Sequence, residues 1–290
     1  MASDTPRPYG EVYDLGYQHY SGPRLGRSHA IRALTIYSIK RGLGIKKKWT
    51  SKIMPALLYT GAFMPAVIVS GILAFAPTGV SFGYHNLFQI VSLVLFVFAA
   101  ALAPEMLSDD RRENVLALYF ARSITRVDYL LSKLFAMAIL MGTMIYGPAA
   151  LLFAANVLLA GDPIAYFFDH LGDLGRIAVS GALAAAFLAA IGLAVAAHTN
   201  RKGVATGLII GGAFVLAGIA AALFNALDSN ARDYVIFLSP MDLMEATSAW
   251  IFGNSPPGMA ALAGVYHAAA MLVVIGLAAG IMYRRYLAED

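Results

Sequence analysis

Six long apolar segments, separated by short polar or charged stretches, dominate the hydrophobicity pattern of the chain. Each has about 20 predominantly apolar residues, the length that an α-helix needs to cross the hydrocarbon core of a bilayer. They cover residues 53–76, 86–107, 129–160, 174–198, 203–225 and 260–283. The pattern therefore predicts an all-α polytopic membrane protein with six transmembrane helices. The third segment is longer than one crossing needs, so we expect its first turns to extend into water.

The remaining residues divide the chain into three parts. Residues 1–52 form a segment before the first span, in which residues 28–50 have the pattern of an amphipathic helix lying at the membrane interface. Residues 53–283 form the transmembrane domain, and residues 284–290 form a short tail. The polar residues 1–27 contain no apolar core typical of a cleavable signal peptide, and the sequence assigns them no role.

Composition and charge support this division. The chain is 59% hydrophobic and only 13% charged, about half of the charged fraction of an average soluble domain. With six spans, 19 of the 21 Lys and Arg residues fall on one side, and only Arg176 and Arg232 fall on the other. The positive-inside rule then predicts that the N- and C-termini are both cytoplasmic. We expect the basic residues to contact lipid headgroups and no nucleic acid, because no compact basic domain presents them.

A charged insert lies between the second and third apolar segments, over residues 108–126. Asp109, Asp110 and Glu113 come early in it and Arg122 comes late, an order that suits a helix macrodipole, and Ser108 or Asp109 can cap its start. The insert is therefore predicted to be a short cytoplasmic helix with one apolar face. That face either rests on the chain's own bundle or docks into a groove of a cytoplasmic partner.

The block that runs from Pro104 to Lys133, PEMLSDDRRENVLALYFARSITRVDYLLSK, resembles the permease subunit of type-2 ABC exporters. In that family, two permease chains form the pathway, and two separate ATPase subunits drive it with ATP and Mg²⁺. The resemblance implies that the helix over residues 108–126 couples to the ATPase and that residues 226–259 form an outer loop with short outer helices before the sixth span. The residues that it assigns to ATPase coupling are Glu113, Leu116, Leu118, Tyr119, Phe120 and Arg122.

The resemblance also implies export across the plasma membrane of a prokaryote. A pathway rich in Ala, Leu, Phe and Met suits a lipid-like or amphipathic substrate. The chain has no G-x-x-x-x-G-K-[ST] phosphate loop, so we expect no ATP hydrolysis and no bound cofactor in this chain itself. The absence of cysteine excludes a disulfide framework and a thiolate metal site.

Polar and small residues inside the spans are the remaining candidates for function. Ionisable groups within a membrane are functional candidates, and the residues that we assign to a pathway or gate are Glu105, Gln89, Tyr146, Asn156 and His267. Hydrogen bonding between helices explains most of them equally well. Gly203, Gly207 and Gly211 share one face of the fifth span, where small residues permit close helix packing, either within one chain or in a homodimer. The resemblance favours the homodimer interface.

Two other classes of function remain as alternatives. Asp109, Asp110 and Glu113 read D-D-x-x-E, like half of the Mg²⁺–diphosphate site of a membrane prenyltransferase, but that chemistry needs a second acidic cluster on the same side. The other candidates for it, Asp169 with Asp173 and Asp228 with Asp233, fall on the opposite side. A passive channel is the second alternative, although the sequence shows no ring of like charges and no filter-like loop.

Overall fold

The structure, a computed structural model, describes residues 22, 25–45, 48–75, 82–112, 116–120, 124–199, 201–227, 229–254, 262 and 264–287. Every regular element among these residues is a helix, which confirms the all-α fold. The helices are α1 (Gly26–Gly42), α2 (Thr50–Phe75), α3 (Tyr84–Arg112), α4 (Leu116–Phe120), α5 (Arg126–Leu159), α6 (Pro163–Asp169), α7 (Leu171–Ala197), α8 (Lys202–Ala226), α9 (Ser229–Arg232), the 3₁₀ helix η1 (Val235–Leu238), α10 (Pro240–Ile251) and α11 (Gly264–Leu287).

Six of these helices are long and apolar enough to cross a membrane, as the hydrophobicity pattern predicts. They are α2, α3, α5, α7, α8 and α11, and their bounds lie within a few residues of the predicted spans. At 34 residues, α5 is about 51 Å long, against about 30 Å for the hydrocarbon core. The helix is therefore longer than a single crossing needs, and the extension of its first turns into water stays a prediction.

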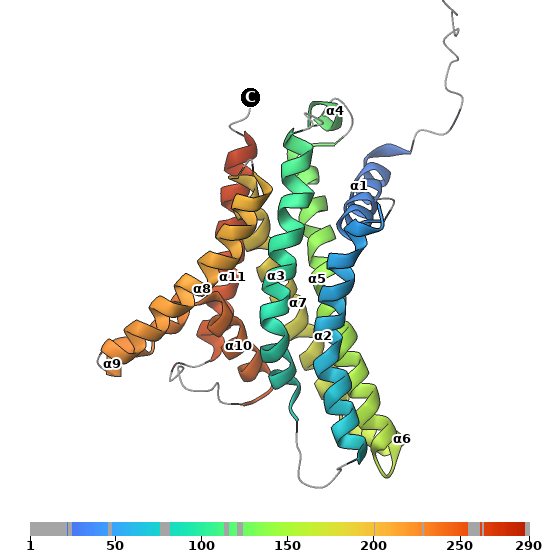
Figure 1. Cartoon of the computed structure of the whole chain (residues 1–290), viewed down its shortest axis with the longest axis vertical. Helices are drawn as coiled ribbons and strands as arrows, with labels where there is room; N and C mark the ends of the chain where they lie inside the picture. The colour runs from blue at the N-terminus through green and yellow to red at the C-terminus, as the bar shows by residue number, and fades with distance from the viewer. Residues whose placement is uncertain are drawn as a thin grey trace, which may run out of the picture.

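The spans form a central group and a peripheral group (Figure 1). In α3, α5 and α7, half or more of the residues in the most apolar stretch are buried, compared with less than a quarter in α2, α8 and α11. Six alanines of α7, among them Ala184, Ala189 and Ala190, are almost completely buried, because small side chains let neighbouring helices approach closely. Figure 1 shows α8 leaning away from the other spans and ending at α9.

The two ends of the bundle differ in charge. Figure 1 shows α1, α4 and the C-terminal end of α11 together at one end, and α6 and α9 toward the other. The first of these, which we call the basic end, carries Arg27, Arg41, Lys133 and Arg284 on the helices that meet there. The shared location of the first helix and the last helix's end agrees with an even number of crossings. The cytoplasmic location of this end stays a prediction.

The insert differs from the single helix predicted over residues 108–126. Helix α3 continues through Ser108 and Asp110 to Arg112 because both side chains are buried against neighbouring helices, so neither Ser108 nor Asp109 begins a new helix. Among the described residues of the insert, α4 is the one separate helix. Helix α5 then begins with a capping box, in which the Asp128 amide donates to Thr125 Oγ1 at 3.2 Å and the Thr125 amide donates to Asp128 at 3.0 Å.

Two other segments pack more closely than the sequence suggests. The predicted interfacial helix is α1, which packs along α5 and α3 and buries Leu34, Ser38 and Gly42. The short helices predicted before the sixth span are α9, η1 and α10, and α10 packs against α3, α7, α8 and α11. Through α10, the segment before the sixth span is therefore partly integrated into the helix bundle.

Candidate functional site

Asp110, near the end of α3, has a fully buried side chain that joins three helices. Its Oδ1 atom lies 2.8 Å from Nη1 of Arg41 on α1. Its Oδ2 atom accepts a hydrogen bond of 2.9 Å from the Tyr129 hydroxyl and lies 2.7 Å from Nζ of Lys133, both on α5. We call Arg41, Asp110, Tyr129 and Lys133 the Asp110 cluster.

The Asp110 cluster is almost completely removed from solvent. The side chains of Lys133 and Arg41 are 1% and 10% exposed, and the Lys133 ammonium also lies 5.3 Å from the centre of the Tyr129 ring. Desolvating charges is costly, and mutual attraction offsets the cost only when geometry and hydrogen bonding are good. Removal of one member therefore destabilises the fold far more than a surface substitution does.

A second ion pair fixes the other end of α1. The Arg27 guanidinium donates two hydrogen bonds to Asp128, from Nε and Nη2, each of 2.8 Å, and the Asp128 carboxylate raises the pKa of Arg27. Arg27 and Arg41 are 14 residues apart, or close to four helical turns, so they lie on the same face of α1. Because Arg27 is 59% exposed, its pair contributes less stability than the buried pair at Arg41.

The ring of Tyr129 connects the Asp110 cluster to α4 and α11. Its centre lies 5.9 Å from the ring of Tyr119 and 6.1 Å from the ring of Phe120, both on α4. On α11, Tyr286 is 2% exposed and its ring lies 5.7 Å from that of Tyr129. Arg126 Nη1 also donates to the Tyr286 carbonyl at 3.0 Å. Tyr129 thus contacts Asp110 through its hydroxyl and α4 and α11 through its ring.

This arrangement bears on the residues assigned to ATPase coupling. Leu116, Tyr119 and Phe120 are half-buried and pack against the hydrophobic core, so the apolar face of α4 rests at least in part on its own bundle. Glu113 and Arg122 lie outside the described residues, and for Leu118 only the backbone is described. The coupling role of all six residues stays a prediction.

The residues assigned to a pathway do not converge on one site. The Tyr146 hydroxyl donates to the Ala178 carbonyl at 2.9 Å, and Asn156 Nδ2 donates to the Tyr84 hydroxyl at 3.1 Å, so both residues connect neighbouring helices. His267 is completely buried beside Phe237, and neither of its ring nitrogens has a hydrogen-bond partner among the described residues. Glu105 lines a cavity at the basic end.

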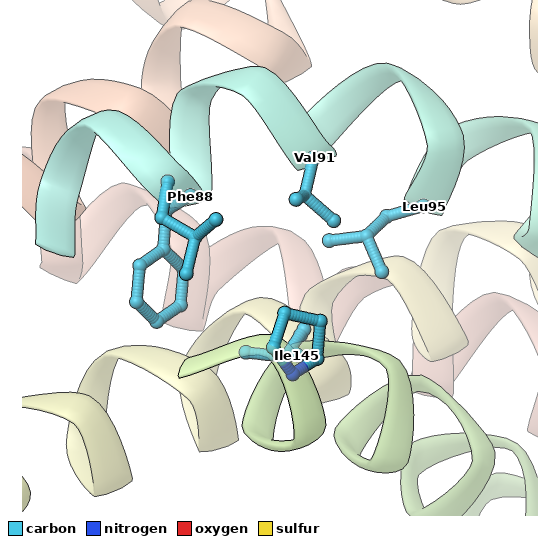
Figure 2. Close-up of a pocket in the computed structure, with 6 residues that line it drawn as sticks. Phe88, Val91, Leu95 and Ile145 are labelled. Carbon is cyan, nitrogen blue, oxygen red and sulfur yellow. The ribbon is translucent and has the colours of Figure 1, made fainter. Parts of the chain in front are cut away.

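The small apolar cavity between α3 and α5 is a packing gap. Figure 2 shows Phe88, Val91 and Leu95 of α3 on one side of it and Ile145 of α5 on the other. Its volume is about 10 Å³, no more than about one water-sized probe. The described lining is entirely apolar, so this gap does not provide a route for a substrate through one chain.

The glycines of the fifth span are open to the surroundings. Gly203, Gly207 and Gly211 are exposed on α8, and a Cβ atom added to any of them would meet no neighbouring atom within 4 Å. Contacts within the described part of one chain therefore do not explain why these three positions are glycine. A homodimer interface stays a prediction.

Sequence reasoning missed two polar residues that the fold shields from solvent: Lys133, which is buried, and Glu245, which is half-buried. Lys133 lies in an otherwise apolar helical stretch. A charged side chain at such a position needs a buried counter-charge, and this was the signal that the sequence offered. Glu245 of α10 was missed because residues 226–259 were expected to lie outside the bundle. Burial and the nearby Asp242 raise the pKa of Glu245, whereas a hydrogen bond with Gln89 of α3 lowers it.

The structure gives no support to the prenyltransferase alternative. The Asp110 carboxylate contacts Arg41, Tyr129 and Lys133, which leaves it poorly placed to bind Mg²⁺. Across the described ranges, no group of three or more His, Asp and Glu side chains could hold a metal ion.

One comparison with known proteins identifies a family. The model of the family described as "ABC-2 family transporter protein" matches residues 12–290, which is nearly the whole chain. No characterised protein matches the chain significantly.

The Asp110 cluster makes a direct prediction about stability. Asp110→Ala leaves Arg41 and Lys133 buried without this carboxylate, so the free energy of unfolding should fall by about 3 kcal/mol or more. The matched control is Asp169→Ala, which removes an exposed carboxylate on α6 and should change stability by less than about 0.5 kcal/mol. Equilibrium unfolding in mixed detergent micelles measures both, and equal effects would contradict a structural role for the cluster.

Proposed function

Because this chain belongs to the ABC-2 family of transporter proteins, we propose that it is the permease of an ATP-driven exporter for lipid-like or amphipathic substrates. It is a multi-pass membrane protein, and the proposed location is the plasma membrane of a prokaryote. Two copies of a separate ATPase subunit would bind ATP and Mg²⁺ and dock at the basic end. This chain would supply the pathway as a dimer with a second permease.

The connection from α4 to the spans is the observation that carries the proposal. A force applied to α4 by an ATPase would reach Tyr129 directly through the rings of Tyr119 and Phe120. From Tyr129 it would pass to α3 and α1 through Asp110, and to α11 through Tyr286. Rigid, buried contacts of this kind can transmit displacement between elements because packed interiors have low compressibility.

A pathway between two chains is favoured by the outer surface of the bundle. The gap between α3 and α5 is too small for a substrate, whereas the peripheral helices α2, α8 and α11 present long apolar faces. Without a hydrophobic driving force inside a bilayer, helices associate through close van der Waals contact, which glycine faces permit. The open glycine face of α8 therefore supports dimerisation through this helix.

The coupling role of α4 can be tested by placing a charge on its apolar face. Leu116→Asp should weaken association with the ATPase by about 1–3 kcal/mol, since binding energy concentrates in a few apolar anchors. The control is Ile164→Asp, the same type of change at a 73% exposed residue of α6, toward the other end. Co-purification of ATP-hydrolysing activity with the tagged chain measures association, and unfolding midpoints verify that both variants fold.

Undiminished ATP-hydrolysing activity with Leu116→Asp would show that α4 is only a loop helix. If no ATP-hydrolysing activity co-purifies even with the unchanged chain, the passive-channel alternative replaces the exporter.

The dimer interface can be tested at the α8 glycines. Replacing Gly207 and Gly211 with Leu should separate the two backbones and weaken dimerisation about tenfold, which corresponds to about 1.4 kcal/mol. The matched control replaces Gly276 and Gly280 of α11, which have the same spacing and are equally open. Cross-linking in vesicles measures dimer yield. A yield that falls only in the α11 variant would move the interface to that helix, and a yield unchanged in both would reject a glycine-mediated dimer.

A further inference from the structure

His267, the fourth residue of α11, is a buried histidine without a polar partner. Its side chain is completely removed from solvent, and neither Nδ1 nor Nε2 has a hydrogen-bond partner among the described residues. Figure 1 shows the C-terminal end of α11 at the basic end. His267 lies about 30 Å before that end along the helix, so it belongs to the opposite part of the bundle.

The start of α11 packs tightly against the short helices that precede it. The ring centre of His267 lies 5.8 Å from that of Phe237 in η1. At Gly264, one turn before His267, a Cβ atom would overlap the side chain of Trp250 at the end of α10. Helices η1 and α10 also pack against each other. We call Phe237, Trp250, Gly264 and His267 the α10–α11 junction, and the imidazole inside it is inaccessible to water.

No charged group compensates His267 in the described part of the chain. Helices α5, α7 and α10 pack against α11, and η1 contains no titratable residue. Glu245 of α10 interacts with Asp242 and Gln89 instead. The titratable or charged side chains that these helices and α11 carry away from the basic end are Tyr146, Asp173, Arg176, Asp242, Glu245 and Tyr266. None of them is a hydrogen-bond partner of His267.

Burial and protonation of this ring exclude each other. A histidine in water takes up a proton near a pH of about 6.5. Placing the resulting cation in an apolar site without a counter-charge or a hydrogen bond is far more costly than placing the neutral ring there. The closed junction therefore holds the neutral imidazole, whereas an opened junction that admits water can hold the imidazolium. Because the open state binds one proton more, its population relative to the closed state rises up to about tenfold for each pH unit below about 6.5.

We propose that His267 makes the α10–α11 junction a pH switch, which is closed at neutral pH and opens as the pH falls below about 6.5. In the open state, water reaches the imidazolium, and α10 and η1 separate from the start of α11. Helix α10 also packs against α3, α7 and α8, so opening would loosen the contacts of these spans at the same end. The switch does not rest on ATP-driven export.

The acidic side chains of α10 act in the opposite direction. Burial and the nearby Asp242 raise the pKa of Glu245, while the hydrogen bond with Gln89 lowers it. A carboxyl group whose pKa is raised in the folded chain binds its proton more tightly there, so acid stabilises the closed packing through Glu245. An opening of α10 on acidification therefore cannot come from Glu245 and would point to His267.

Amide hydrogen exchange of α10 and η1 on either side of the histidine titration tests the proposal. The chain is measured in detergent micelles at about pH 7 and about pH 5, and each rate is divided by the intrinsic rate of an unfolded amide at the same pH. Protection of α10 and η1 should fall about tenfold from the higher pH to the lower, since the switch opens over this range. Protection in the middle of α5 should not change.

Two histidine substitutions show which ring is responsible. His267→Phe keeps a ring beside Phe237 but cannot take up a proton, so protection of α10 should not fall at the lower pH. The matched control is His198→Phe, which replaces an exposed histidine at the end of α7. This control should keep the full fall in protection, because His198 already contacts water in the closed state.

Phe237→Glu tests the charge without changing His267. It places a carboxylate beside the ring, so the imidazolium gains a counter-charge in the closed junction and the fall in protection should become smaller. The result is a ratio of protection at the two pH values within one variant, so a general loss of stability does not imitate it. The proposal is overturned if protection in the unchanged chain is the same at both pH values, or if His267→Phe or Phe237→Glu keeps the full fall. The ATPase takes no part in these measurements, so a failure of ATPase association would leave their result untouched.

Discussion

One carboxylate, that of Asp110, has to be neutralised in the interior of the bundle, and the arrangement of the basic end follows from this requirement. A fully buried carboxylate is tolerable only with close cations and satisfied hydrogen bonds. Arg41, Lys133 and Tyr129 supply them from α1 and α5. Meeting this requirement brings the end of α1 against α3 and sets the position of the first turns of α5. It also places the Tyr129 ring where α4 and α11 can pack on it.

The same network makes the basic end resist displacement in a way that an apolar contact alone would not. Ion pairs and hydrogen bonds have directional geometry, so a displacement of Tyr129 would strain the bonds that connect it to Asp110 and, through Asp110, to Arg41. Arg27 and Arg41 bind acidic partners at the two ends of α1. The proposed ATPase contact therefore has a buried support that includes both ends of α1.

Hydrophobicity predicted the parts of the fold that depend on local sequence, and it could not predict the parts that depend on contacts between distant residues. The six spans were recoverable because a bilayer imposes a minimum apolar length on each helix. The pairing of Arg41 with Asp110 spans 69 positions in the sequence, and no periodicity encodes it. The same reason explains why Ser108 and Asp109 seemed suitable helix caps, although α3 continues beyond them. Intramembrane polar residues such as Tyr146 and Asn156 were identified as candidates, but their interhelical hydrogen bonds emerge only from the fold.

The central claim is that Tyr129 connects α4 to α1 through Asp110, and amide hydrogen exchange on Tyr129→Phe tests it most directly. This substitution keeps the ring on which α4 packs and removes only the hydroxyl that donates to Asp110. A hydrogen bond to a charged group contributes about 1.5–3 kcal/mol, so exchange in the last turns of α1 should accelerate about tenfold or more. The control Tyr146→Phe, which removes the hydrogen bond to Ala178, should leave α1 unchanged. Exchange in α1 that is the same in Tyr129→Phe and in the unchanged chain would contradict the account.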